Sequence, residues 1–196
     1  MVAGITIFND KNSIQVDDRF NTYGLNSKQV IRNIQYLPEG INALSPVVAG
    51  NPIKFISFTQ SADIEVFNFT SMDSTYENLG LQVFKGDGSV AFHSSAKPLR
   101  IIDFFRKNVR NSYGSPDLLS VTRKYPGYSR LGIVMSNQVP IFANIDGLWR
   151  ICMPRVTIHA NGDIYFEYEH MEAPVQNMNI TTSGYNDFIV ADLTNY

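Results

Sequence analysis

Residues 78–105 read NLGLQVFKGDGSVAFHSSAKPLRIIDFF, with alternating apolar residues at positions 81, 83, 90 and 92. Apolar residues that alternate with polar or small ones have the period of a half-buried β-strand. Between the two runs, Lys85–Ser89 contains two glycines, which readily take the positive φ angles of a tight reversal. The stretch therefore predicts a β-hairpin. The pattern of the following segment, Leu99–Val109, fits an extended strand slightly better than a helix.

The same pattern occurs at the start of the sequence. Residues 4–14 (GITIFNDKNSI) align without a gap on residues 80–90 (GLQVFKGDGSV), with Gly, Phe and Ser identical. Residues 156–166 (VTIHANGDIYF) form a weaker third copy. We predict that residues 4–17 and 80–93 form superposable hairpins with one strand register. The alternative is three unrelated hairpins in one β-rich domain.

Length and a polar break limit the domain organisation. A chain of 196 residues with 44% apolar content can form one ordinary domain or two small ones, with a proper core. Residues 71–77 are polar and separate the two best copies of the hairpin pattern. We predict two closely packed, related halves, residues 1–75 and 76–196, or one continuous sandwich.

Short apolar runs between turn residues extend over the remaining chain. Turn signals every ~10 residues, without βαβ alternation, predict an all-β protein, an antiparallel sandwich or barrel built from short hairpins. Residues 44–51, near two prolines, are interpreted as connecting chain, and Asp146–Gly147 is a strong hairpin signal. The further predicted strands are 29–37, 53–59 with 64–69 as its hairpin partner, 118–124, 131–135, 139–145, 148–153 and 187–193.

The charge content argues against two classes of partner. The formal net charge is −2 and only 17% of residues are charged, whereas nucleic acids and anionic membranes attract a basic face. No run approaches the ~20 apolar residues of a membrane span, and the first residues lack the basic start of a signal peptide. We expect a protein that is made in a cytoplasm and either stays there or joins an assembly formed there.

The sequence contains no recognisable catalytic, cofactor or metal motif. The single cysteine, Cys152, lies in an apolar run, and the three histidines lack the i, i+2 or i+4 spacing of a metal pair. Asp163, Glu167 and Glu169 share one face of a predicted strand, which would suit a pair of glycosidase carboxylates, but strand alternation alone explains a solvent face. We therefore expect no enzyme activity, no cofactor and no metal.

Three tyrosines in loops are the candidate interface residues. Loops on a rigid β scaffold commonly carry binding, and interfaces favour aromatic residues. Tyr113 lies in a loop rich in Ser, Gly and Pro, and Tyr125 and Tyr128 share a turn. The alternative is that these rings cap the ends of the sandwich. Exposed tyrosines, including Tyr165, are also able to stack on a sugar.

One stretch resembles a known group of proteins. This stretch is similar to an uncharacterised group of small tailed-bacteriophage virion proteins. The likeness lies in the strand Gly80–Phe84, the turn and strand Gly88–Phe92, the step His93–Ser95 and the run Lys97–Ile102. Residues 3–9 look like the usual opening of that group. His93 stands where Asp is common, and the likeness covers about a quarter of the chain.

The resemblance implies a β-rich virion protein of the tail tip or fibre-attachment region. Its implied partners are other virion proteins and copies of itself, and it carries no catalytic residues. We expect a structural protein that acts by surface complementarity. The alternatives are a carbohydrate- or host-receptor-binding module of the same architecture and, least favoured, a glycan hydrolase. A tyrosine-lined groove would favour sugar binding, and apolar patches would favour assembly.

Overall fold

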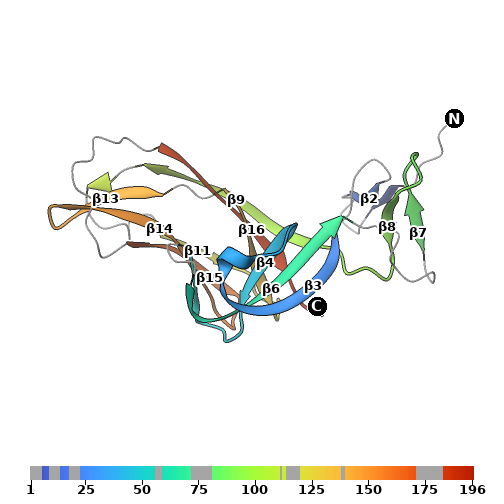
Figure 1. The fold of residues 1–196 in the computed structure, drawn as a ribbon, viewed down its shortest axis with the longest axis horizontal. Helices are drawn as coiled ribbons and strands as arrows, with labels where there is room; N and C mark the ends of the chain where they lie inside the picture. Colours follow the sequence, from blue (N-terminus) through green and yellow to red (C-terminus); the bar gives the residue numbers. More distant parts are fainter. Residues whose placement is uncertain are drawn as a thin grey trace.

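The structure, a computed structural model, describes residues 6–8, 14–17, 23–55, 59–71, 81–110, 112–113, 120–137, 140–170 and 183–196. These residues form an all-β protein of mainly antiparallel sheets, which confirms the predicted fold class. Within these ranges the only helical segment is the single 3-10 turn η1 (Ile34–Tyr36), in which the Gln35 amide donates to the Asn33 side chain. Two six-stranded sheets form the main body, and two small hairpins lie to one side of it (Figure 1).

Sheet I contains four strands of ten or more residues. The first residues of one edge strand meet the residues just before the other, where Leu99 N donates to Tyr23 O (2.9 Å) and Leu25 N donates to Lys97 O (2.8 Å). The sheet is therefore curled so that its edges touch at one end. The strand order is β3 (Tyr23–Asn33), β6 (Thr59–Ser71), β4 (Ile41–Pro46), β12 (Leu131–Asn137), β16 (Ser183–Asp192) and β9 (Arg100–Arg110).

Sheet II packs against one face of sheet I. Its order is β10 (Ser112–Tyr113), β13 (Ile141–Ile145), β14 (Leu148–Ile158), β15 (Asp163–His170) and β11 (Val121–Lys124), with β5 (Pro52–Lys54) also paired to β14. The predicted Asp146–Gly147 hairpin joins β13 to β14, and both of its turn residues have positive φ.

The main core lies between the two sheets. Phe105 of β9, Phe166 of β15 and Phe188 of β16 form a ring cluster with centroids 4.6–5.1 Å apart. Aliphatic residues of both sheets surround them, namely Leu44, Ile53, Ile64, Val66, Leu131, Ile133, Val156, Ile158, Ile164 and Val190. Each large apolar side chain buried in this way contributes about 1.5–3 kcal/mol to the free energy of unfolding.

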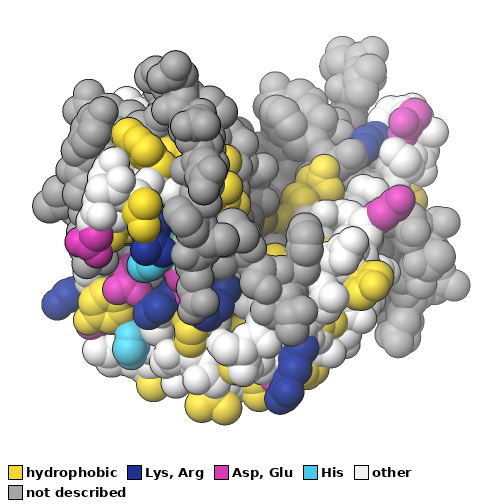
Figure 2. Space-filling view, turned by 60° about the vertical axis from the view of Figure 1, so that its left-hand side comes forward, with side chains coloured by type: hydrophobic (Ala, Val, Ile, Leu, Met, Phe, Trp, Pro, Cys, Tyr) yellow, Lys and Arg dark blue, Asp and Glu magenta, His cyan; other side chains and the backbone are white. Residues whose placement is uncertain are grey.

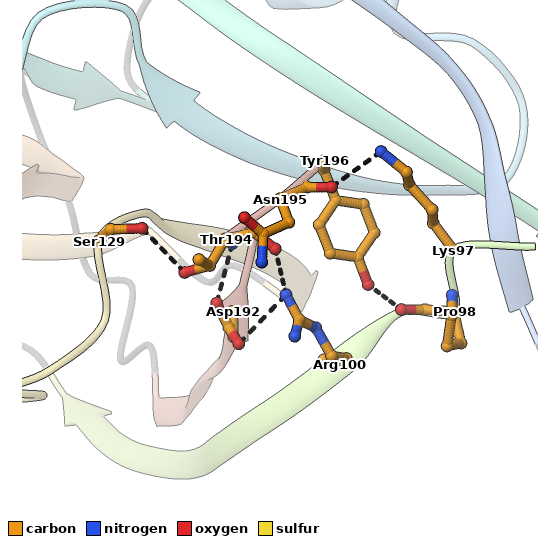
Figure 3. A network of polar contacts seen from close by, with 8 residues as sticks. All are labelled: Lys97, Pro98, Arg100, Ser129, Asp192, Thr194, Asn195 and Tyr196. Carbon is orange, nitrogen blue, oxygen red and sulfur yellow. Dashed lines mark hydrogen bonds and ion pairs between the residues drawn. The ribbon is translucent and has the colours of Figure 1, made fainter.

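A second core covers the opposite face of sheet I. Strand β6 buries both faces, because Phe67 and Phe69 point away from the main core and pack against the ring of Tyr196. Figure 3 shows how the segment after β16 is held there: the Tyr196 hydroxyl donates to the Pro98 carbonyl, and Lys97 Nζ donates to Asn195 O (2.8 Å). This segment thus connects the end of β16 with the start of β9.

The two predicted hairpins share one register. In β1 (Thr6–Phe8) and β2 (Ile14–Asp17), Thr6 pairs with Asp17 and Phe8 with Ile14, with a bulge between Ile7 and Phe8. In β7 (Gln82–Phe84) and β8 (Val90–His93) every pair recurs at the aligned positions, and so does the bulge. The predicted equality of register is therefore confirmed.

The third copy forms a hairpin, but not at the predicted alignment. Its turn repeats the turn of β7–β8 once the alignment is moved slightly: Gly162 N donates to His159 O as Gly88 N does to Lys85 O. The side chains of Asp87 and Asn161 both accept a hydrogen bond from the amide two residues later. Its strands pair without a bulge, so the turn chemistry is shared and the strand register is not.

The strand order of sheet I is the same when read from either edge. Along the chain, residues up to Ser71 supply a hairpin, the edge strand β3, the central strand β4, and then β6, which lies between β3 and β4 in the sheet. Residues from Gln82 supply, in the same order, a hairpin, the edge strand β9, the central strand β12, and then β16, which lies between β9 and β12 in the sheet. Tyr23 and Leu99, which occupy equivalent positions after the two hairpins, lie next to each other where the edges meet. The division into residues 1–75 and 76–196 stays a prediction.

Three local predictions were wrong. The strand predicted at residues 29–37 ends at Asn33, and residues 34–36 form η1. Residues 41–46, assigned in part to connecting chain, form the central strand β4, which is buried on both sides and therefore lacks alternation. Residues 53–59 and 64–69 do not form a hairpin, because the polar residues 60–63 belong to the long strand β6. Gln60 is buried and its amide exchanges two hydrogen bonds with the Lys54 main chain, at 2.7 and 2.8 Å. The Gln60 side chain, and not a turn, therefore provides the hydrogen-bond partners of the Lys54 main-chain amide and carbonyl.

Two glycines with positive φ provide a matched test of the contact between the β11–β12 turn, which contains Gly127, and the β14–β15 turn, which contains Gly162. A Cβ on Gly162 (φ +84°) would overlap the carbonyl oxygen of Tyr125, whereas a Cβ on Gly127 (φ +92°) would meet open space. We expect Gly127→Ala to cost about 1–2 kcal/mol from backbone strain alone. Gly162→Ala should cost roughly 3 kcal/mol or more, because the turn must also move. Thermal unfolding measures the difference, and equal losses would contradict the contact between the two turns.

Candidate interaction surface

Tyr125 is engaged within the protein. Its ring is half-buried against the main core, its hydroxyl donates to Asp103 Oδ2 (2.5 Å), and its main-chain amide donates to Gly162 O. Burial and the Asp103 carboxylate together raise the pKa of Tyr125. This tyrosine therefore fastens the β11–β12 turn to β9 and to the β14–β15 turn.

The other two candidate tyrosines lie in different settings. Tyr128 shares the turn with Tyr125, packs at the border of the main core, and lines a cavity of about 240 Å³ together with Arg130 and His159. Tyr113 belongs to β10, whose main chain pairs in parallel with Asn144 of β13, and its side chain lies outside the description. The role of these tyrosines in an interface stays a prediction.

Each carboxylate in the row on β15 has a local partner. Ile164, Phe166 and Tyr168 point into the protein, so the odd-numbered residues lie on the outer face, as alternation predicts. There Glu169 binds Lys54 (2.6 Å) and Glu167 binds Arg155 (3.2 Å). Asp163 accepts a hydrogen bond from the side chain of Asn161. These carboxylates act as cross-strand ion pairs or turn acceptors.

Two residues with possible chemical roles have structural ones here. His93 is fully buried, and its Nδ1 lies 3.1 Å from the amide nitrogen of Ser95 and 2.6 Å from its hydroxyl oxygen, so it shapes the turn after β8. Burial raises the pKa of the Cys152 thiol to about 11, so the thiol stays protonated at neutral pH. Within the described ranges no group of three His, Cys, Asp or Glu residues is placed to hold a metal ion.

The sequence patterns missed an apolar surface at the edge of sheet I. A bulge in β9 places Ile101 opposite Ala191 and Phe104 opposite Ile189, and these two residues of β16 lie on one face of the sheet. Ile101 and Phe104 are 55% and 54% exposed. We call Ile101, Phe104 and Ile189 the β9 patch. Spacing in the sequence gives no sign of it, because residues three apart in a regular strand face opposite ways.

A cavity of about 490 Å³ lies beside the β9 patch and has an apolar wall. Among the described residues that line it, none is charged, and Asn42 supplies the one polar side chain. Its volume falls within the range of small-molecule sites, but it lacks the several convergent polar groups that orient a small ligand. Apolar residues of β4, β9, β12, β16 and their neighbours make the wall, namely Ile34, Leu37, Ile41, Leu44, Phe55, Leu99, Ile101, Val134 and Ile189.

On the face that Figure 2 shows, basic and acidic side chains lie next to one another, so the charged side chains there do not form a patch of one sign. None of the described residues forms a helix with the length and hydrophobicity that a membrane crossing requires.

No protein-family model matches the chain, and no curated protein or solved structure matches it either. The described residues offer an exposed apolar patch and two cavities as surfaces for contact.

The buried thiol makes a specific prediction for alkaline stability. The folded state holds Cys152 protonated up to about pH 11, whereas an unfolded thiol ionises near pH 9. Its stabilising contribution is therefore complete below pH 9 and is lost as the pH rises toward 11. Cys152→Ala should flatten the decline in the free energy of unfolding between pH 9 and 10, measured by urea denaturation.

Tyr168→Phe is the control for this pH window. Burial also raises the pKa of Tyr168, but its unfolded pKa is 10.0, so this variant should change the profile only at higher pH. An unchanged slope in the Cys152 variant would show that the thiol is not shielded from water.

Proposed function

We propose that the protein is a structural component of a tailed-phage virion, acts by protein–protein assembly, and belongs to the tail tip or fibre-attachment region. The observation that supports assembly is the β9 patch, an exposed apolar surface beside an uncharged cavity. Surfaces of this kind commonly mark protein contact sites. The assignment to a phage rests on the resemblance of residues 80–102 to small tail proteins.

The hairpin lobe, β1–β2 with β7–β8, offers a second contact surface away from the sheets (Figure 1). Leu81 and Phe84 are half-exposed on it. The first hairpin carries Ile5 and Phe8 at the aligned sequence positions, so the same apolar pattern occurs twice. A protein with two separate apolar surfaces is suited to link neighbours in an assembly.

A carbohydrate- or receptor-binding module is the second candidate. The cavity of about 240 Å³ near Tyr128 favours it, because Tyr128, Arg130 and His159 all contribute to its lining. However, Arg130 is already paired with Glu65, which removes much of its capacity to recognise an acidic sugar. Glycan-array binding that is lost in Tyr128→Ala would support this function instead.

Incorporation into particles tests the proposed assembly role. We expect the chain in purified virions, and we expect particles that lack it to show altered composition and reduced infectivity. Phe84→Asp should reduce incorporation, because it places a charge in an apolar contact. Tyr36→Asp is the matched control, since Tyr36 is an exposed aromatic residue (72%) of η1 in the main body. Absence of the chain from purified particles would rule the proposal out.

A further inference from the structure

We infer that two copies of this chain associate through the outer edge of β9, with Ile101 and Phe104 of each copy packing against those of the other. This inference deepens the proposed assembly role, on which it rests, by naming one partner and its surface. Four features of β9 support it: an unpaired edge, an apolar patch, a neighbouring cavity and three charged residues that already have partners.

None of the strands that the structure describes pairs with the outer edge of β9. It pairs with β16 from Arg100 to Arg110 on one side. On the other side, among the strands that the structure describes, contact with the β3 edge ends at Pro98 and Leu99. Residues 102–110 therefore present roughly 30 Å of main chain, at about 3.4 Å per residue, to an incoming strand. Such an edge is a template for pairing with another chain.

The bulge in β9 gives this edge an apolar face. Ile101 pairs with Ala191 and Asp103 with Val190, so Ile102 is the extra residue. The bulge rotates Ile101 onto the face that Phe104 occupies, and both side chains are about half exposed. Exposed apolar residues on an unpaired strand are a liability unless a partner covers them.

The patch and the cavity fit a two-fold contact. Ile101 and Ile189 form part of the cavity wall, while Phe104, opposite Ile189, projects beside it. A two-fold interface uses the same surface on both subunits, so any side chain that projects from one copy must meet a complementary part of the same surface on the other. The β9 surface contains both a projecting group and a hollow, which favours a second copy over a partner of unrelated shape.

Three charged residues of β9 are paired within the chain. Arg100 binds Asp192 (3.2 Å), Arg106 binds both oxygens of Asp187 (2.7 and 2.9 Å), and Asp103 accepts from Tyr125. These residues therefore select no strongly charged partner. For these three residues, association of two β9 strands brings no unpaired like charges together. Lys107 and Arg110 lie on the same strand, and each must lie away from its counterpart in the second copy, because like charges directly opposite each other destabilise a strand pair.

The opposite edge of sheet I shows the usual protection. Strand β3 carries Lys28 and Arg32, which bind Glu65 and Asp63 and keep a charged surface toward solvent. Among the described residues of this strand, Val30 is the one strongly exposed aliphatic residue, at 58%. Charged side chains on an edge strand discourage pairing with another chain. Both edges carry paired charges, and β9 differs in that two exposed apolar residues share one face beside a cavity.

Sedimentation equilibrium of the full chain tests the inference. We expect a dimer at about 100 µM, a concentration that populates complexes of micromolar affinity. Phe104→Asp and Ile101→Asp should each weaken the dimer about a hundredfold, because each places a carboxylate in the apolar contact. Both sites are half exposed, so circular dichroism should show folded monomers. Val30→Asp, the matched control on β3, should leave the dimer unchanged.

The outcomes separate this inference from the proposed function. A wild-type chain that stays monomeric at this concentration overturns the inference, and so does a dimer that survives both β9 substitutions or is lost in the Val30 variant. Presence in purified virions is measured independently. A chain found in virions but monomeric in solution would contradict the β9 dimer and leave the virion role in place.

Discussion

The contact between the two edges of sheet I determines the arrangement of the rest of the protein. Two main-chain hydrogen bonds link Tyr23 and Leu25 with Lys97 and Leu99. Each contributes only about 1 kcal/mol net to stability. Their larger effect is geometric, because they curl the sheet at one end and place the starts of β3 and β9 side by side. The hairpins that precede these strands are thereby brought to the same end of the molecule (Figure 1).

Sheet I has a core on each of its two faces. One face packs on sheet II around Phe105, and the other holds Phe67, Phe69 and the ring of Tyr196. Polar contacts at the start of β9 keep Tyr196 in place, including the pairing of Arg100 with Asp192 (Figure 3). The same strand β9 therefore closes the sheet, holds the segment that covers the second core and presents its outer edge. Structural closure and the proposed association thus involve different parts of one strand.

The candidate surface was only partly accessible from the sequence. Tyr125 was identified as an interface candidate because it lies in a turn, yet its hydroxyl reaches Asp103, 22 residues away in the sequence. Ile101 and Phe104 were not singled out, because their common face results from a bulge that exists only in the pairing with β16. A buried central strand such as β4 likewise lacks alternation, so its apolar residues resembled connecting chain. In each case the missing information was the identity of the neighbouring strand.

The sequence by itself determined the all-β class, the turns and the shared register of the first two hairpins. These features depend on glycines, turn side chains and two-residue alternation, all of which act over a few residues. Tertiary structure decided which strands are neighbours, that residues 60–63 continue a strand, and which β9 side chains are exposed. These features depend on contacts between residues far apart in the chain, such as Gln60 near β5 and Phe104 opposite Ile189. Local preferences do not specify such pairings, because any half-buried strand is able to pair with several others until the cores fix one arrangement.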